Sequence, residues 1–206
     1  IFFYKESAFM YRHFFKRFLD VVVSLCGFIV LFPLFILLAV LIKIDDGGPV
    51  FFTQKRMGWH DIPFSIYKFR SMRTEAPHDC ATEKLDNPET WITKTGRWMR
   101  RTSLDELPQI LNIIRGDMSI IGPRPVVLTE TELIALRKRY GVDEIRPGLT
   151  GWAQINGRDE VSVKKKAILD GEYNAKMSFL FDLKIFLATF VSVFEEKGIH
   201  EGKRAN

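Results

Sequence analysis

Cysteine is scarce in this sequence, since only Cys26 and Cys80 occur among 206 residues. Neither stands at a spacing typical of a metal site, and two thiols so far apart form no disulfide framework. The chain also has no internal repeat and no low-complexity linker. These absences argue against a disulfide-rich secreted domain or a repeat protein, and they predict reduced thiols within or facing a cytosolic compartment.

Charged side chains are absent from residues 21–42, an apolar run with Pro33 near its middle. An unbroken helix of this length would reach about 33 Å, close to the ~30 Å thickness of a bilayer's hydrocarbon core. Proline removes a backbone donor and clashes with the preceding turn, so Pro33 should kink or break the helix. Each arm beside Pro33 is too short to cross a membrane alone.

Basic residues, which favour the cytoplasmic side of a membrane, flank the apolar run at Arg12, Lys16, Arg17 and Lys43. A re-entrant helical hairpin with Phe32 and Pro33 at its bend enters and leaves the same leaflet, which accounts for both flanks and the proline. A single-pass anchor is the main alternative, because proline occurs in transmembrane helices. A secretory signal peptide is disfavoured, since the run is too long and lacks a small-residue cleavage site.

The overall composition, with 47% hydrophobic and 27% charged residues, suits one globular domain and a membrane segment. We expect an interfacial lead-in and re-entrant helix over residues 1–45 and the globular domain over residues 46–206. The formal net charge of +5 fits anionic lipid headgroups, nucleotide diphosphates or nucleic acid, and charge alone does not choose among them. The chain begins with Ile1 rather than Met, and whether it is a fragment of a longer protein stays open.

Local patterns predict an α+β fold that is mainly helical, with amphipathic interfacial helices and a small β-hairpin. The hairpin strands are expected over residues 49–54 and 63–69, which are rich in β-branched and aromatic side chains. We expect an amphipathic lead-in over residues 4–17, a polar loop over 74–88, and helices over 93–101, 107–115, 129–140, 159–176 and 178–194. The last helix carries five phenylalanines and suits either the protein core or the bilayer interface.

The densest chemical signal is the adjacent acid pair Asp105 and Glu106, which follows Arg100 and Ser103. Ser103 followed three residues later by Glu106 matches a capping box, so one interpretation is that the acids only start a helix. The alternative is catalytic, because one carboxylate at a helix start could act as a nucleophile while the other binds a divalent cation such as magnesium. Arg100 is placed to contact phosphate oxygens.

Two rigid loops present further cationic side chains. Arg124 stands between two prolines in GPRP (residues 122–125), and Arg146 opens RPGLTG (residues 146–151). We interpret both arginines as phosphate-binding candidates, although each loop alone is a weak signal. Further candidates for substrate binding are Lys68, Arg70, Gln154 and Arg158.

Five ordered motifs together resemble the bacterial sugar transferases, the monotopic polyprenyl-phosphate phosphoglycosyl transferases. They are KRFLD (16–20), YKFRSM (67–72), SLDELPQ (103–109), GDMSIIGPRP (116–125) and RPGLTG (146–151). The likeness extends from residue 11 to about residue 193. So many motifs in order make a chance match very improbable.

The resemblance implies a monotopic enzyme at the cytosolic face of a bacterial cytoplasmic membrane, with a catalytic domain over residues 46–206. Asp105 would attack the sugar-proximal phosphate of a nucleoside diphosphate sugar, a UDP-sugar by family likeness, and form a phosphosugar–aspartyl intermediate. Polyprenyl phosphate, usually undecaprenyl phosphate, would then accept the phosphosugar in a ping-pong reaction. The expected cofactor is Mg²⁺ at Asp105 and Glu106, and the expected partners include membrane lipids but no nucleic acid. The product would begin an exopolysaccharide, capsule, O-antigen or glycoprotein glycan.

One departure from the family pattern concerns the bend of the hairpin. Family members commonly have serine before the hairpin proline, able to satisfy freed backbone groups, whereas Phe32 precedes Pro33 here. Two other functions stay open: a single-pass anchored nucleotide-sugar phosphohydrolase and a non-enzymatic membrane scaffold. The sugar, the polyprenol length and the oligomeric state do not follow from the sequence.

Overall fold

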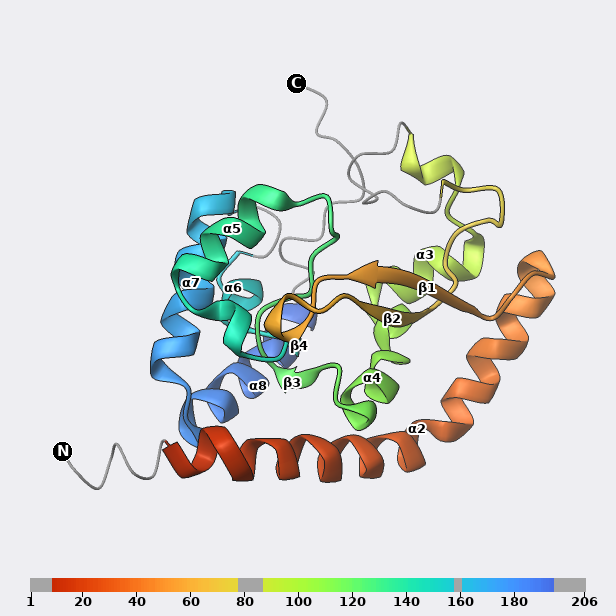
Figure 1. Ribbon diagram of the computed structural model, residues 1–206. Helices are drawn as coiled ribbons and strands as arrows, with labels where there is room; N and C mark the ends of the chain where they lie inside the picture. The colour runs from red at the N-terminus through yellow and green to blue at the C-terminus, as the bar shows by residue number, and fades with distance from the viewer. Residues whose placement is uncertain (1–8, 78–86, 158–160, 195–206) are drawn as a thin grey trace.

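The structure, a computed structural model, describes residues 9–77, 87–157 and 161–194 (Figure 1). The fold is mainly helical with two small two-stranded sheets, which confirms the predicted class and the small hairpin. The helices are α2 (Lys16–Asp46), α3 (Lys94–Arg101), α4 (Gln109–Arg115), α5 (Thr131–Arg139), α6 (Trp152–Ile155), α7 (Val163–Lys176) and α8 (Phe179–Phe194). The strands are β1 (Phe51–Arg56), β2 (Phe64–Phe69), β3 (Ser119–Ile121) and β4 (Gly148–Thr150). The start of the predicted lead-in, most of the loop expected over 74–88 and Arg158 lie outside the described residues.

Helix α2 follows a π-helical turn at Tyr11–Phe15. Pro33 lies inside α2, and Figure 1 shows the helix as two arms joined by a bend, as expected for proline in a helix interior. Gly47 ends the helix in the left-handed conformation, with φ 68°. In the described part of the chain, α2 is the one helix long and apolar enough to cross a membrane.

Most of the surface of α2 is apolar and exposed. The exposed side chains include Val22, Val23, Leu25, Ile29, Val30, Phe32, Ile36, Leu37 and Val40. Phe32, beside the proline, packs edge-on against Phe28. The second arm buries Phe35, Leu38 and Ile42 against Phe69 and Met99, so only a narrow stripe of this arm contacts the rest of the protein.

Both ends of α2 are joined to the same globular body. At the start of the helix, Lys16 Nζ lies 2.6 Å from Asp182 Oδ2, which belongs to α8. At its end, Asp46 Oδ2 lies 2.8 Å from Nη2 of the buried Arg70, directly after β2. The two arms therefore leave this body and return to it.

Strands β1 and β2 pair antiparallel, with Phe51 opposite Phe69 and Arg56 opposite Phe64, which confirms the predicted hairpin. The strands begin two residues and one residue later than expected. Pro49 and Pro63 stand just before them, and proline lacks the N–H that a strand ladder requires.

The predicted helices after the hairpin are all present; each begins one to four residues later than expected and ends at the expected residue or one residue before it. The Thr93 side chain caps α3 by accepting a hydrogen bond from Gly96 N at 2.9 Å, and Gly116, with φ 101°, ends α4. Helix α8 has one face in the core and one on the surface, because Ile185 is fully buried while Leu180, Leu187 and Phe190 are exposed.

Strand β4 lies in the predicted loop over 146–151, and β3 lies in a segment for which no element was predicted; the two form a parallel pair with Ser119 opposite Gly148 and Ile121 opposite Thr150. Glycines allow the close approach. A Cβ on Gly148 would lie 2.1 Å from Gly122 N, and one on Gly151 would lie 2.0 Å from Gly122 O. The glycines of the two loop motifs thus bring their backbones into direct contact, which places Arg124 and Arg146 on neighbouring segments.

Candidate active site

Asp105 and Glu106 lie in a 3-10 turn (Leu104–Glu106) between α3 and α4. Ser103 before the turn adopts a left-handed conformation, with φ 55°, and its side chain makes no capping hydrogen bond. The capping-box interpretation is therefore wrong. The Glu106 side chain turns instead toward cations from two distant segments.

Glu106 is neutralised by two side chains. Its Oε1 accepts hydrogen bonds from Lys68 Nζ at 2.9 Å and from Arg124 Nη2 at 2.7 Å, while Arg124 Nη1 lies 3.3 Å from Oε2. Burial alone would raise the pKa of Glu106, but the charges and hydrogen bonds of Arg124 and Lys68 hold it well below its usual range. Glu106 is therefore a fixed anion at neutral pH.

Asp105 has a different environment from its neighbour. The residue is 7% exposed, and its carboxylate makes no hydrogen bond or ion pair within the described residues. Burial raises the pKa of Asp105, the charge of Glu106 adds to the rise, and Lys68, Arg100 and Arg124 oppose it. The structure thus brings together five residues that were predicted separately, with one carboxylate left open among them.

Asn112 on α4 connects this turn to the hairpin. Its Oδ1 accepts a hydrogen bond from Tyr67 N at 2.9 Å, and its Nδ2 donates to Ser65 O at 2.8 Å. Asn112 is fully buried, and both bonds go to main-chain atoms of β2. These bonds fix Lys68, one residue beyond Tyr67, relative to the acid pair at the other end of α4.

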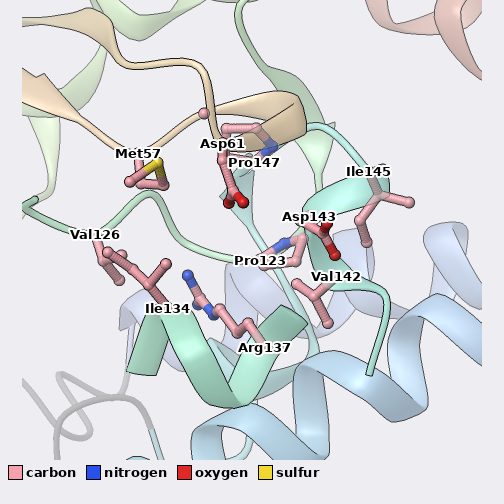
Figure 2. A pocket seen from close by; sticks show the side chains of 11 residues that line it. Met57, Asp61, Pro123, Val126, Ile134, Arg137, Val142, Asp143, Ile145 and Pro147 are labelled. Carbon is pink, nitrogen blue, oxygen red and sulfur yellow. The ribbon is translucent and has the colours of Figure 1, made fainter. Parts of the chain in front are cut away.

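The main chain of Arg124 is bound by Arg137, a residue that was not predicted from the sequence. Arg137 Nη1 donates to Arg124 O at 2.9 Å, while its Nε and Nη2 lie 2.8 and 2.7 Å from Oδ2 of the buried Asp170. Figure 2 shows Arg137 reaching from α5 into a cavity of about 40 Å³ beside Pro123. No local pattern marks Arg137, because its partners lie 13 and 33 positions away.

The other predicted substrate-binding residues lie apart from Asp105. Arg70 is buried against Asp46 at the end of α2. Arg146 donates from Nε to Gly116 O at 2.9 Å and stacks on the Trp59 ring at 3.9 Å. Gln154 donates to Leu149 O at 3.1 Å, and its buried Oε1 accepts no hydrogen bond from the described residues. Their roles in substrate binding stay predictions, as does that of Arg158.

The acid pair fits a magnesium ion in donor chemistry, because Mg²⁺ takes hard oxygen ligands and uses one or two carboxylates together with substrate phosphates. The described residues contain no cluster of three or more His, Cys, Asp or Glu side chains that could hold a metal ion. Asp105 is the better placed of the two acids, since Lys68 and Arg124 already bind the Glu106 oxygens. The protein side of such a site would thus consist of these two adjacent carboxylates.

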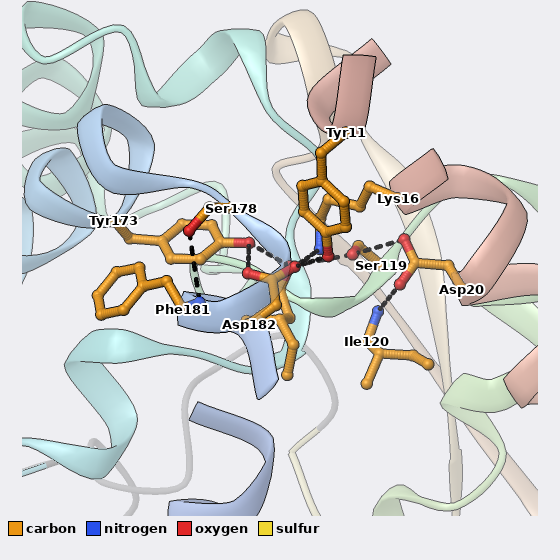
Figure 3. Close-up of polar contacts among 10 residues, drawn as sticks. Tyr11, Lys16, Asp20, Ser119, Ile120, Tyr173, Ser178, Phe181 and Asp182 are labelled. Carbon is orange, nitrogen blue, oxygen red and sulfur yellow. Dashed lines mark hydrogen bonds and ion pairs between the residues drawn. The ribbon is translucent and has the colours of Figure 1, made fainter. Parts of the chain in front are cut away.

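A second buried charge cluster ties the start of the chain to α7 and α8 (Figure 3). Asp182 Oδ2 accepts from Tyr11 Oη at 2.7 Å and from Lys16 Nζ at 2.6 Å, and its Oδ1 accepts from Tyr173 Oη at 2.8 Å. Next to it, Asp20 accepts hydrogen bonds from Ser119 Oγ and the Ile120 amide at 2.7 and 3.1 Å. This cluster fixes the first arm of α2 on the strand that leads into the Arg124 loop.

Comparison with known proteins finds a matching family model and related sequences. The family model described as "Bacterial sugar transferase" matches residues 11–196. The uncharacterized sugar transferase EpsL of Bacillus subtilis (strain 168) is 44% identical over 160 residues, which are 78% of this chain and 77% of that protein.

Two longer relatives also match. The undecaprenyl-phosphate glucose phosphotransferase of Komagataeibacter xylinus is 39% identical over 184 residues, which are 84% of this chain and 35% of that protein. The UDP-glucose:undecaprenyl-phosphate glucose-1-phosphate transferase of Escherichia coli (strain K12) is 37% identical over 192 residues, 90% of this chain and 41% of that protein. This chain thus spans less than half of either longer relative. The matches confirm the resemblance seen in the sequence motifs, and the chain belongs to the bacterial sugar transferase family.

Proposed function

We propose that this protein is a phosphoglycosyl transferase that moves a phosphosugar from a UDP-sugar to polyprenyl phosphate. The products are a polyprenyl diphosphosugar and UMP, and the reaction begins a bacterial glycoconjugate. The names of the relatives from K. xylinus and E. coli support the acceptor, and the latter also supports the donor. The observation that carries the proposal is the buried Asp105 carboxylate, which has no partner among the described side chains and lies beside three cations.

The proposed reaction has two steps through Asp105. First, a carboxylate oxygen of Asp105 attacks the sugar-proximal phosphorus, the bond from phosphorus to the bridging oxygen breaks, and UMP leaves with that oxygen. Then an oxygen of polyprenyl phosphate attacks the same phosphorus, and the acyl-phosphate bond breaks to restore the carboxylate. Covalent catalysis of this kind divides one transfer between a water-soluble and a lipid substrate into two separate steps.

The cations around Asp105 serve the phosphate groups in this scheme. Arg124 and Arg100 present guanidinium groups near the nucleophile, and such groups match phosphate oxygens and the negative charge that grows on the leaving group. Mg²⁺ at the acid pair would add Lewis-acid stabilisation of the same charge. Glu106 keeps Lys68 and Arg124 in place before substrate binds, because it accepts hydrogen bonds from both.

We further propose that α2 is a re-entrant membrane helix and that the enzyme is monotopic at the cytosolic face of the cytoplasmic membrane. A single span would separate its ends by about the ~30 Å core of the bilayer. The ion pairs Lys16–Asp182 and Asp46–Arg70 join both ends to one globular body, which supports re-entry. The exposed apolar residues of α2 and of α8 then face lipid, and Asp105 lies in the body that both ends contact.

The decisive experiment traps the covalent intermediate. Purified protein is incubated with UDP-sugar and Mg²⁺ without lipid acceptor, and peptide mass spectrometry should locate a phosphosugar on Asp105. Asp105→Asn should abolish both the adduct and UMP release. A phosphosugar released into water in place of transfer to lipid would instead favour the phosphohydrolase, and full function of Asp105→Ala would favour the scaffold.

Topology needs its own test. Single cysteines at Met10 and Ile44, both exposed near the two ends of α2, are introduced after replacing Cys26 and Cys80 with serine. A membrane-impermeant maleimide should label both positions from the cytosolic side only, as it labels Lys138→Cys on α5. Labelling of the two positions from opposite sides would favour the single-pass anchor.

A further inference from the structure

A cleft of about 570 Å³ opens between the start of α2, the loop that joins β1 to β2, and the segment before β4. Its walls include Arg12, Arg17, Asp20, Trp59 and Arg146. Its volume is within the range of small-molecule sites, roughly 300–1,000 Å³. Asp105, Glu106 and the three cations beside them are not among the residues that line it.

The cleft lies at the opposite end of the hairpin from the acid pair. Trp59 stands in the connection beyond the Arg56–Phe64 pair, whereas Lys68, which binds Glu106, is four residues further along β2. At about 3.4 Å per residue, this alone separates the two regions by roughly 14 Å. The cleft is therefore distinct from the proposed catalytic centre.

Two guanidinium groups of the cleft are fixed by neutral main-chain atoms. Arg17 donates to Ile113 O at 2.6 Å and to Ile114 O at 3.0 Å, at the end of α4. Arg146 donates to Gly116 O at 2.9 Å, just after the same helix, and lies on the Trp59 ring. Carbonyl partners orient these side chains but leave their positive charges in place.

Arg12, Arg17 and Arg146 lie near carboxylates in the cleft but are not paired with them. Within the described parts of the chain, Arg12, Arg17 and Arg146 form no ion pair with a carboxylate. Burial lowers the pKa of Arg146, and repulsion from Arg17 lowers it further. The Asp20 carboxylate, which accepts hydrogen bonds from Ser119 and the Ile120 amide (Figure 3), offsets part of this repulsion, and Asp143 and Glu144, just before Arg146, also line the cleft. An anion bound between Arg17 and Arg146 would relieve their repulsion.

The position of Arg17 indicates the source of such an anion. Arg17 directly precedes Phe18, which is 64% exposed, and follows Phe14, which is 68% exposed, by three residues. In the topology of the proposed function, on which this step rests, Phe14 and Phe18 contact lipid and Arg17 lies at headgroup depth. We propose that the cleft binds the phosphate of a glycerophospholipid headgroup, in forked contact with Arg17 and Arg146.

The test measures lipid retention by native mass spectrometry on the delipidated full chain, titrated with phosphatidylglycerol. Arg146→Gln should weaken lipid binding at least tenfold, and Arg12→Gln should weaken it less. Arg139→Gln is the matched control, because Arg139 is exposed on α5 away from the cleft. Arg17→Gln removes two hydrogen bonds from α4, so Arg146→Gln carries the test where the Arg17 variant does not fold. Equal binding by Arg146→Gln and Arg139→Gln would overturn the proposal.

Two competitors separate the lipid headgroup from other phosphates. Farnesyl phosphate, a short polyprenyl phosphate, should not displace phosphatidylglycerol, and displacement would overturn the proposal by assigning the cleft to the acceptor. Inorganic phosphate should compete only weakly. Binding of inorganic phosphate without any binding of phosphatidylglycerol would also overturn the headgroup assignment.

UMP release from UDP-sugar, measured on the same preparation, separates this proposal from the proposed function. Lipid retention that depends on Arg146, in a protein that releases no UMP, would leave the cleft standing and reject the transferase. UMP release together with lipid retention that does not depend on Arg146 would support the transferase and reject the lipid site in the cleft.

Discussion

Two buried charge clusters in this molecule differ in how completely their carboxylates are bound. Around Asp182, Tyr11 and Lys16 bind one oxygen and Tyr173 binds the other (Figure 3). Around the acid pair, Lys68 and Arg124 bind Glu106, while Asp105 receives no hydrogen bond from any described residue. The closed cluster suits a structural joint, since buried charges are stable when they are paired. The open cluster keeps one carboxylate available for chemistry, and burial of that group costs stability.

The largest expected effect is the loss of activity in Asp105→Asn. Removing the nucleophile should lower UMP release by roughly 1,000-fold or more, because UMP leaves only in the step in which Asp105 attacks the phosphorus. Its thermal midpoint should stay unchanged or rise, since the variant removes a buried carboxylate whose pKa is raised by burial. Activity assays and thermal unfolding in detergent measure the two outcomes. A variant that is inactive only because it is unfolded would contradict the contrast between the clusters.

Asp182→Asn should show the opposite pattern. The substitution leaves the buried Lys16 ammonium without its counter-charge, and breaking a buried ion pair in this way costs about 3–5 kcal/mol. Thermal unfolding should therefore shift strongly, while the fraction that remains folded keeps its kcat. Lys176→Met, which removes an exposed pair with Glu172, is the matched control and should unfold close to wild type. A normal midpoint together with lost catalysis would place Asp182 in the chemistry.

Arg137→Gln tests a residue that acts on the open cluster from outside it. Without its bond to Arg124 O, the Arg124 guanidinium loses support over Glu106, and misplacement of about 1 Å can cost up to roughly 100-fold in rate. We expect a lower kcat in Arg137→Gln and partial rescue in Arg137→Lys, which keeps the charge beside Asp170. Lys138→Gln, next along α5 and paired with the surface Asp61, is the control. If Arg137→Gln and Arg137→Lys lost stability to the same extent while both kept the wild-type kcat, Arg137 would have only a structural role.

The acid pair could be found from the sequence because its two residues are adjacent. Its electrostatics could not be predicted, because they depend on residues far away in the sequence. Adjacency and the flanking motifs marked Asp105 and Glu106. The opposite pKa shifts of the two acids depend on Lys68 and Arg124, which reach the turn from β2 and from the loop after β3. The order of residues in the sequence does not predict that these cations bind Glu106 rather than Asp105.

The features that the sequence did not predict have a similar cause. Strands β3 and β4 are three residues long, too short for an alternating pattern, and they are recognised only by pairing with each other. The Tyr11–Asp182 bond joins residues 171 positions apart. Arg70 follows Lys68 by two positions, so both were candidates for the substrate, yet the chain turns Arg70 toward Asp46. The long helix, the hairpin and the glycine stop of α4 were readable because neighbouring residues determine them.

The smallest expected effect concerns the closed cluster at high pH. Burial and the charge of Asp182 raise the pKa of Tyr173 well above its usual range, so the folded protein keeps this proton when the unfolded chain loses it. The stability that this provides is full below about pH 10, the pKa of a free tyrosine, and is lost as pH rises through the higher pKa of the folded state. Tyr173→Phe should cost about 1.5–3 kcal/mol at pH 8, by loss of a hydrogen bond to the charged Asp182.

The same variant should show a flatter decline in thermal midpoint between pH 10 and 11, without abolishing it, because the pKa of Tyr11 is raised by burial and by the same Asp182. Tyr140→Phe, on an exposed side chain, is the matched control and should reproduce the wild-type slope. A Tyr173→Phe slope as steep as that of wild type would mean that the Tyr173 hydroxyl titrates as a free phenol. The cluster would then be open to water at Tyr173, and its contrast with the Asp105 site would no longer hold.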